Sequence, residues 1–289
     1  MMTTLFALLS LRMPPLGLLS SAIVALVTLR RGELQGLQLM LWSGLASALL
    51  GLLALGTAAP VIAVLLVFWL PIWLVAVVLR VVRSLPLAVE TAALMGGLLI
   101  LGVYLFVADP VALWRGSLEE LFAGPLLESG VGDATAVAAL LDEAARLMTG
   151  MLAAGFFLQL VVALVLGRWW QAYLYNPGGF RQEIQAFRLD RILAYLALPL
   201  LAGAFLAKGG FADFFRDAAF LMGSAYLVQG TTLVHGVSGL LGANQAWLVG
   251  FYVLLVIAMP QAVVIVATLG YVDAWMDFRG RLRSRKTGG

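Results

Sequence analysis

The sequence predicts an all-α, polytopic integral membrane protein, and three observations support that prediction. Hydrophobic residues make up 63% of the 289 residues and charged residues only 11%, against about 25% charged residues in soluble domains. The mean hydropathy is +1.02. Apolar blocks of roughly 20 residues, the length that crosses a bilayer, recur between short arginine clusters. We therefore expect about eight transmembrane helices in a single membrane domain that covers residues 1–289.

The apolar blocks define the expected helices in chain order. The first, residues 3–29, contains Arg12 and is broken at Pro14–Pro15, because proline inside a helix removes a hydrogen bond and kinks or ends the helix. The later blocks cover residues 34–55, 61–79, 86–107, 147–166, 192–207, 218–241 and 247–271. Between the fourth and fifth blocks lies a polar, amphipathic insertion, residues 109–146. In it, Ser117 and Glu120 fit a capping box, and residues 133–148 predict a second helix, rich in alanine.

Lysine and arginine in the loops set the expected orientation. If the spans alternate, one side receives Arg30, Arg31, Arg80, Arg83, Arg168, Arg181, Arg188 and Arg191. The positive-inside rule makes that side cytoplasmic, together with the basic tail 278–289, and makes the insertion 109–146 extracytoplasmic. The expected location is the bacterial cytoplasmic membrane.

Three apolar blocks separate Arg191 from the tail, and an odd number would place the tail outside. We expect residues 247–271 to form a broken or re-entrant pair at Pro260. The alternative is that residues 192–207, which contain Pro199, do not cross the membrane.

Residues 168–191 form a polar elbow between two apolar blocks, which we expect to be cytoplasmic. Phe180, Ile184 and Phe187 fall on one face of a helix, with Arg181 and Arg188 on the other side. This pattern predicts an amphipathic helix in the membrane interface. The elbow either only fixes the topology, or offers these five residues as a docking surface for a membrane or cytoplasmic protein partner. We expect replacement of both arginines to leave folding intact.

One apolar span contains several polar side chains. Gln229, Thr232 and His235 are spaced by three residues, so they share one broad helix face. They either form hydrogen bonds between helices or line a small-molecule site together with Arg12, which lies beside the proline break. After the last block, Asp277 and Arg281 are spaced to pair along a helix.

Catalysis and metal binding are not predicted. Cysteine is absent and His235 is the only histidine, which excludes disulfides, thiolate metal sites and multi-histidine metal sites. The net charge of +3 is spread over topology clusters, so nucleic acid is not an expected partner. We expect a non-enzyme without cofactors, catalytic residues or metal sites, embedded in a lipid bilayer.

Two motifs carry a resemblance to a known family. The segment "RWWQAYLYNPGGFRQEIQAFRLDR" and, later, "LVHG" followed by "LGYVDAWMDFRGRLR" resemble the YybS-like family of bacterial membrane proteins of unknown function. That family is distantly similar to the S components of energy-coupling-factor transporters and to the rod-shape protein MreD. The first similarity implies small-molecule binding for transport. The second implies the alternative, a membrane scaffold that recruits partners.

Overall fold

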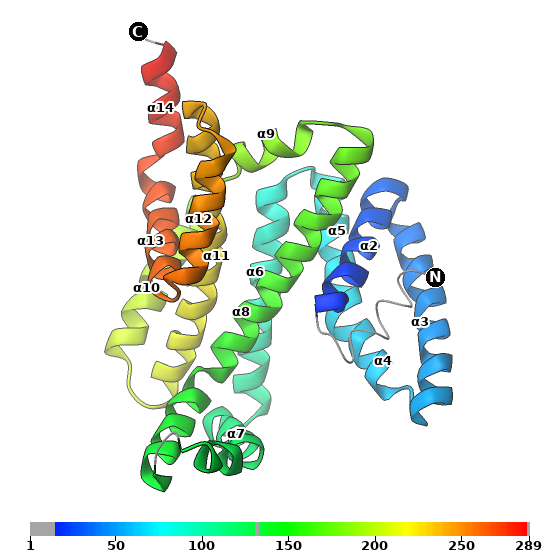
Figure 1. Cartoon of the computed structure of the whole chain (residues 1–289), viewed down its shortest axis with the longest axis vertical. Helices are drawn as coiled ribbons and strands as arrows, with labels where there is room; N and C mark the ends of the chain where they lie inside the picture. Colours follow the sequence, from blue (N-terminus) through cyan, green and yellow to red (C-terminus); the bar gives the residue numbers. More distant parts are fainter. Residues whose placement is uncertain (1–14, 131–132, 288–289) are drawn as a thin grey trace. The chain divides into compact units, whose positions relative to one another are not determined.

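The computed structural model describes residues 15–130 and 133–287, and every element in this part of the chain is a helix (Figure 1). The elements are α2 (Pro15–Arg31), α3 (Glu33–Leu55), α4 (Ala59–Val64), the π-helical turn η1 (Leu65–Trp69), α5 (Leu70–Val82), α6 (Leu85–Phe106), α7 (Pro110–Glu128), α8 (Ala134–Tyr175), α9 (Gly179–Ala186), α10 (Arg191–Leu206), α11 (Gly210–Leu241), α12 (Gln245–Ile257), α13 (Gln261–Met276) and α14 (Phe278–Thr287). The all-α prediction is confirmed for these residues. Arg12 and Pro14, and with them the predicted break in the first helix, lie outside the described residues.

Several helices are long and apolar enough to cross a membrane. Four stretches meet this condition: Glu33–Leu53, Ile62–Val82, Leu85–Phe106 and Ala134–Tyr175. A fifth is possible if the bent pair Gly179–Ala186 and Arg191–Leu206 counts as one span. The structure therefore supports a helical membrane protein with four or five such segments, and the count of eight stays a prediction.

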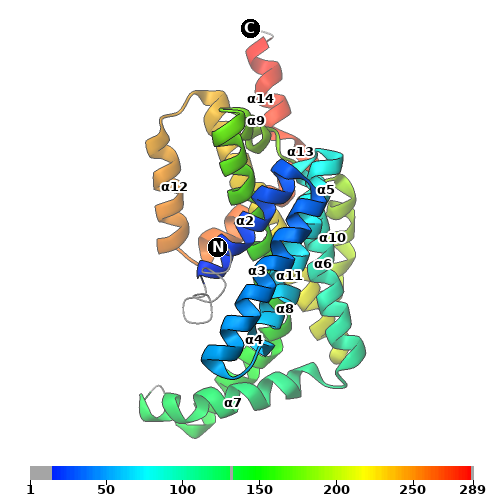
Figure 2. The same ribbon diagram turned by 90° about the vertical axis from the view of Figure 1, so that its right-hand side faces the viewer.

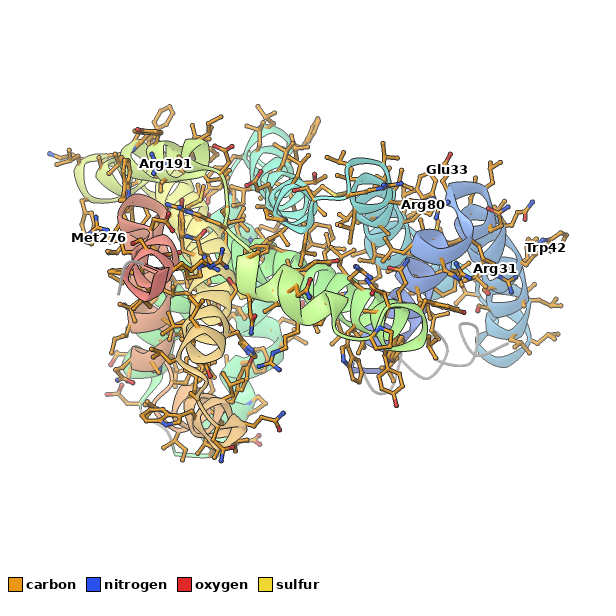
Figure 3. The ribbon with its side chains drawn as sticks, turned by 90° about the horizontal axis from the view of Figure 1, so that it is seen from above. Arg31, Glu33, Trp42, Arg80, Arg191 and Met276 are labelled. Carbon is orange, nitrogen blue, oxygen red and sulfur yellow. The ribbon has the colours of Figure 1, made fainter. Side chains whose placement is uncertain are left out.

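Large apolar side chains cover much of the outer surface of these helices. Trp42 is 72% exposed, Phe106 89% and Phe205 85%. Figure 3 shows the Trp42 ring projecting from α3 on the side away from α2. A water-soluble protein rarely leaves so many large apolar side chains in water, whereas a bilayer solvates them. The exposure pattern thus agrees with the composition.

The chain divides into two compact units, each built from separate stretches of sequence. Unit 1 contains Met1–Ala92, Leu158–Asp190 and Ala225–Gly289, and unit 2 contains Ala93–Phe157 and Arg191–Ser224. Helices α6, α8 and α11 contribute residues to both units. The boundaries of the units are therefore not those of successive domains along the chain, and the single-domain prediction stays a prediction.

In unit 1, α2 packs against α3 and α5. The core of this packing includes Trp69, which is fully buried and donates its indole N–H to Ser20 Oγ at 3.0 Å. A buried indole N–H requires such a partner. Thr28 and Gly36 lie at the crossing of α2 and α3, where a Cβ on residue 36 would collide with the threonine hydroxyl. The glycine therefore permits the close approach of these two helices.

Helix α8 is a single element of 42 residues, and this differs from the sequence prediction. The helix break that the sequence "NPGG" predicts at residues 176–179 is present, but we expected a surface helix over 133–148 and a separate span over 147–166. The helix instead runs from Ala134 to Tyr175 without a break. At 1.5 Å per residue it is about 63 Å long, twice a hydrocarbon core of about 30 Å. Both ends of α8, which contain charged residues, can therefore extend beyond the bilayer while remaining helical.

The starts of α7 and α8 are each fixed by an aspartate. Asp109 accepts a hydrogen bond from Ala112 N at 2.9 Å, and α7 begins at the following residue, Pro110. The predicted capping box at Ser117 is wrong, because this residue lies inside α7 and donates to Leu113 O. Asp133 accepts from the Thr135 hydroxyl and from Ala136 N. These hydrogen bonds, the one from Thr135 first, hold the pKa of Asp133 below its ordinary value.

The apolar block that contains Pro260 is broken, as predicted. Helix α12 ends at Ile257 and α13 begins at Gln261. Figures 1 and 2 show α12 and α13 running in opposite directions. At about 20 Å and 24 Å, neither helix reaches across a hydrocarbon core of about 30 Å.

The amphipathic helix of the elbow is shorter than predicted. Helix α9 ends at Ala186, and Phe187 adopts an extended backbone with φ −58° and ψ 127°. The helical spacing that grouped Phe187 with Phe180 and Ile184 therefore does not apply. Phe187 is 1% exposed and Leu189 2%, so both side chains are buried.

Candidate functional site

The elbow and the C-terminal helices of unit 1 share a group of polar contacts that we call the elbow network. Its members are Gln185, Arg188, Gln229, Asp273, Asp277 and Arg279. Arg188 Nη2 donates to the backbone oxygens of Asp273 at 3.1 Å and Ala274 at 2.9 Å, and Nη1 lies 3.2 Å from Asp277 Oδ1. The last carbonyls of a helix lack partners within it, and a cation there also interacts favourably with the helix dipole. Arg188 therefore stabilises the end of α13.

These contacts correct two expectations. Asp277 pairs with Arg188, not with Arg281, because α13 ends at Met276 and Asp277 takes a left-handed backbone. The expectation that Arg188 can be removed without affecting the fold conflicts with its three bonds to α13 and its cap. Arg181, in contrast, is exposed.

The centre of the elbow network is a buried ion pair. Arg279 Nη2 lies 2.8 Å from Asp273 Oδ2, and the two side chains are 6% and 0% exposed. The other carboxylate oxygen accepts from Phe278 N at 3.0 Å, and Arg279 Nη1 donates to Gln185 O at 3.4 Å. A buried charge is tolerated only when it is paired and hydrogen-bonded. The first residues of α14 are thus joined to both α13 and α9.

Gln229 and Thr232 are committed to contacts within the protein. Gln229 is fully buried, accepts from Leu189 N at 2.9 Å and donates to Gly270 O at 2.9 Å. Thr232 Oγ1 donates to Gln229 O at 2.8 Å. A Cβ on residue 270 would overlap Tyr226 O, so α11 and α13 are in backbone contact here. That Gln229 and Thr232 bind a ligand stays a prediction. The hydrogen bonds of Gln229 match the alternative, hydrogen bonding between helices.

His235 lies apart from this pair. Its Nε2 is 2.8 Å from the hydroxyl of Tyr252, which joins α11 to α12. A cavity of about 880 Å³ lies near the same two helices, lined mainly by apolar residues such as Val234, Trp247 and Phe251. His235 is not among its lining residues. The structure therefore does not bring Gln229, Thr232 and His235 around one cavity.

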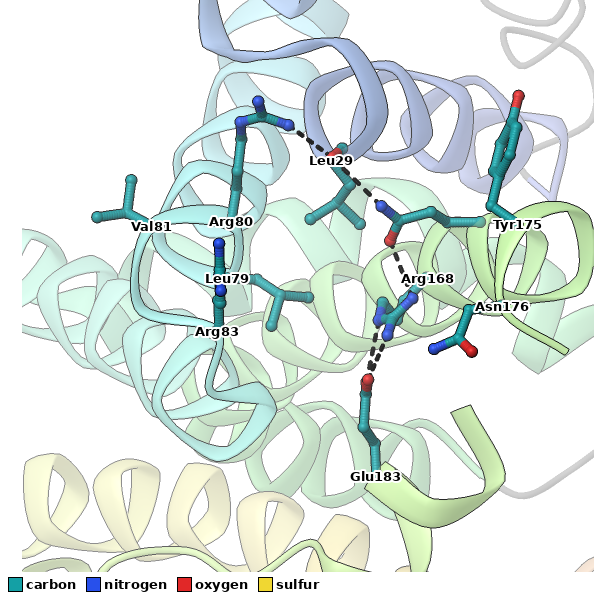
Figure 4. A pocket seen from close by; sticks show the side chains of 10 residues that line it. Leu29, Leu79, Arg80, Val81, Arg83, Arg168, Tyr175, Asn176 and Glu183 are labelled. Atoms are coloured by element: carbon teal, nitrogen blue, oxygen red, sulfur yellow. Dashed lines mark hydrogen bonds and ion pairs between the residues drawn. The ribbon is translucent and has the colours of Figure 1, made fainter. Parts of the chain in front are cut away.

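A second cavity in unit 1 is polar and has a volume of about 630 Å³. We call it the arginine cavity. Its polar lining residues are Arg80, Arg83, Arg168, Gln171, Asn176 and Glu183. Figure 4 shows Arg80 and Arg83 on the α5 side and Arg168 and Asn176 on the α8 side. The volume lies within the range of about 300–1,000 Å³ that is usual for small-molecule sites.

One wall of the arginine cavity is fixed by hydrogen bonds. Arg168 binds both carboxylate oxygens of Glu183 and donates through Nη1 to Gln171 Oε1 at 3.0 Å. Gln171 in turn donates to Leu29 O at 3.3 Å, and Arg80 Nη1 donates to the same oxygen at 2.7 Å. These bonds connect α2, α5, α8 and α9 around the cavity.

Arg83 and Asn176 are the open members of the lining. Both are exposed, and within the described part of the chain neither side chain has a hydrogen bond or ion pair. Arg83 also has a left-handed backbone, with φ 57°. Sequence reasoning used Arg80 and Arg83 only for topology, and it did not single out Asn176 for a site. The spacing of residues along the sequence could not indicate this cavity, since lining residues such as Leu29 and Gln171 are 142 positions apart.

Unit 2 contains a buried carboxylate that sequence reasoning also missed. Asp217 is 2% exposed and accepts from Tyr104 OH at 2.7 Å and Gly150 N at 2.9 Å. Its neighbour Asp213 lies 3.7 Å from Arg146. Each oxygen of Asp217 thus has a donor, and this arrangement is that of a structural contact between α6, α8 and α11.

Among the described residues, no group of three or more histidine, cysteine, aspartate or glutamate side chains is placed to hold a metal ion. Comparison of the chain with protein-family models, curated proteins and solved structures found no match. The resemblance to the YybS-like family therefore stays a prediction. The arginine cavity is the candidate ligand site, because it combines a suitable volume with polar groups that have no partner in the described residues.

Proposed function

We propose that this protein binds a polar small molecule in the arginine cavity, in a transport-related role like that of the S components that it resembles. The observation that carries the proposal is the cavity of about 630 Å³, in whose lining the side chains of Arg83 and Asn176 have no hydrogen bond or ion pair within the described residues. A preformed cleft with a few convergent polar groups is the usual form of a small-molecule site. Relative to the expectation from sequence, the proposed site moves from the His235 span to the ends of α5 and α8.

The proposed topology places the elbow and the tail on the cytoplasmic side of a bacterial inner membrane. Its support is the positive-inside rule together with the elbow network, in which Arg188 and Gln185 of the elbow contact α13 and α14. Helices α12 and α13 form a re-entrant pair in this topology, since each is shorter than the hydrocarbon core. The proposed count remains about eight membrane segments. The arginine cavity then opens at the cytoplasmic side.

A plug in the cavity tests the ligand site. Asn176→Trp places a large side chain in the lining, and Tyr173→Trp is the matched control, because Tyr173 is 73% exposed at the same end of α8 and does not line the cavity. We would measure the melting temperature of purified protein with a panel of nucleotides, sugar phosphates, vitamins and carboxylic acids, since a ligand of the folded state raises it. The expected result is a compound that stabilises the wild type and the control but not the plugged variant. A panel without any such compound contradicts the proposal.

A second candidate function is the scaffold that the MreD similarity implies. One observation favours it: Arg181 of α9 is exposed and has no partner in the described residues, beside the half-buried Phe180 and Ile184. A photo-crosslinking amino acid at position 181 tests it in cells. A reproducible protein adduct at this position, absent when the probe replaces exposed Leu53 of α3, supports the scaffold. Its absence contradicts the scaffold.

A further inference from the structure

We propose that the ligand of the arginine cavity carries a phosphate group, which Arg83, Arg80 and Asn176 bind. This inference rests on the proposed function and specifies its ligand class. Three independent features of unit 1 support it: the charge of the lining, the free donors, and the backbone of Arg83.

The lining has an excess of positive charge. Glu183 neutralises Arg168, which it binds through both carboxylate oxygens. Arg80 and Arg83 have no acidic partner in the described residues. Arg30 adds a further cation beside the cavity, with its guanidinium 4.0 Å from the ring centre of the lining residue Tyr175. The cavity therefore favours an anionic ligand over a neutral or cationic one.

The free donors are arranged for several acceptor oxygens. Arg80 uses only Nη1, on Leu29 O, so its other nitrogens remain for a ligand. Arg83 offers a whole guanidinium from the same end of α5, and Asn176 offers an amide from the α8 side. A single arginine satisfies a carboxylate with two parallel bonds. Two arginines and an amide match the three terminal oxygens of a phosphate better.

The backbone of Arg83 indicates that its side chain has a function. The residue caps α5 with φ 57°, and its N–H donates to Leu79 O. Glycine is the usual residue at such a helix end, and a side chain there costs about 1–2 kcal/mol. Neither the helix dipole nor the positive-inside rule requires arginine at this position, because Arg80 in the last turn already supplies a cation. The strained arginine is explained by a ligand that needs its guanidinium.

Two sources supply this chemistry. A water-soluble phosphoester reaches the cavity from the aqueous side. A phospholipid headgroup reaches it from the membrane, because Arg83 directly follows the apolar stretch Ile62–Val82 and the lining residue Val81 is 68% exposed. The experiment therefore has one arm for each source.

The soluble arm is calorimetric titration of the purified, delipidated full chain with inorganic phosphate, pyrophosphate and glycerol 3-phosphate, and with citrate as a carboxylate control. The variants are Arg83→Gln and the matched Arg281→Gln, which removes an exposed arginine from α14. The lipid arm counts bound phosphatidic acid against phosphatidylcholine by native mass spectrometry of the same proteins. We expect a phosphate compound in one arm to bind the wild type and Arg281→Gln equally, and Arg83→Gln about 10- to 100-fold more weakly.

The other outcomes overturn the proposal. It fails if citrate binds as tightly as the phosphates, if Arg83→Gln and Arg281→Gln behave alike, or if no phosphate compound binds in either arm. Should Arg83→Gln fold poorly, Arg83→Gly removes the same guanidinium from a backbone that glycine prefers. A phosphate-free compound whose stabilisation depends on Asn176 leaves the proposed function standing without this inference. If no ligand depends on Asn176, both the proposed function and the proposed phosphate specificity are wrong.

Discussion

Two helices of unit 1 end on a non-glycine residue with a left-handed backbone, and the two ends differ in what the side chain does. Helix α5 ends at Arg83, with φ 57°, and α13 at Asp277, with φ 48°. In each case the N–H of this residue donates to the carbonyl four positions earlier. Asp277 also accepts from Gly280 N at 3.1 Å and pairs with Arg188. The Arg83 side chain has no hydrogen bond or ion pair within the described residues.

Asp277 and its partner Arg188 have a structural role, whereas Arg83 is available to a ligand. At the end of α13, bonds within the protein offset the cost of the left-handed residue. At the end of α5, nothing in the described chain offsets it, and the side chain lines a cavity. The left-handed residue therefore has a different role in the elbow network and in the arginine cavity. Four predictions test this distinction.

The largest expected effect is on the buried ion pair. Arg279→Met leaves Asp273 buried without its partner, and loss of one member of such a pair costs about 3–5 kcal/mol. We expect a large fall in melting temperature in a nonionic detergent, measured by tryptophan fluorescence. Arg281→Met is the control, because Arg281 is exposed on the same helix. Equal stability of the two variants would show that the elbow network does not stabilise the fold.

The next effect is on Gln229, which joins the elbow to α13. Gln229→Leu keeps the volume but leaves Leu189 N and Gly270 O without their partner. An unsatisfied buried polar group costs about 1–3 kcal/mol, so unfolding by denaturing detergent should shift clearly to lower concentration. Thr231→Val is the control, since the Thr231 hydroxyl bonds only within its own helix. If the leucine variant keeps its ligand affinity while losing stability, Gln229 is structural and not part of the ligand site.

The two arginines of the elbow should behave differently. Arg188→Ala removes the cation from the end of α13 and should cost about 1–2 kcal/mol. Arg181→Ala should leave stability unchanged, because Arg181 is exposed and has no partner in the described residues. Melting temperatures of the two single variants measure the difference directly. Equal values would remove the distinction between the bound and the free arginine.

The sequence predicts the class of fold and much of the helix layout, since apolar blocks and prolines act locally. The break near Pro260 is an example. It does not predict that residues 134–146 and the span that follows them form one helix, α8, because polar residues in a helix that extends beyond the membrane resemble a loop. It also misplaces Phe187, since the helical pattern assumes a helix that in fact ends at Ala186.

The candidate site was harder to predict than the fold. Gln229, Thr232 and His235 stand out in the sequence because they are polar residues in an apolar block. The structure shows that the polar groups of such a residue can be hydrogen-bonded to backbone groups of the protein, as those of Gln229 are. The arginine cavity draws its lining from α2, α5, α8 and α9, and no spacing along the chain signals that these residues meet. From the sequence, the arginines of this cavity therefore indicated only the orientation of the helices in the membrane.

The smallest expected change in stability comes from substitution of the two left-handed residues themselves. Arg83→Gly relieves the backbone and loses no contact within the described chain, so stability should stay level or rise by about 1 kcal/mol. Asp277→Gly gains the same relief but loses the bonds to Arg188 and Gly280, so its stability should not rise. Melting temperatures without ligand give this pair of values, and the titrations described above give the affinities. The expected pattern is a stable Arg83→Gly that binds phosphate weakly, and an Asp277→Gly that binds it normally. A loss of stability in Arg83→Gly would mean that the guanidinium stabilises the fold. The left-handed backbone of Arg83 would then not indicate a ligand at this position.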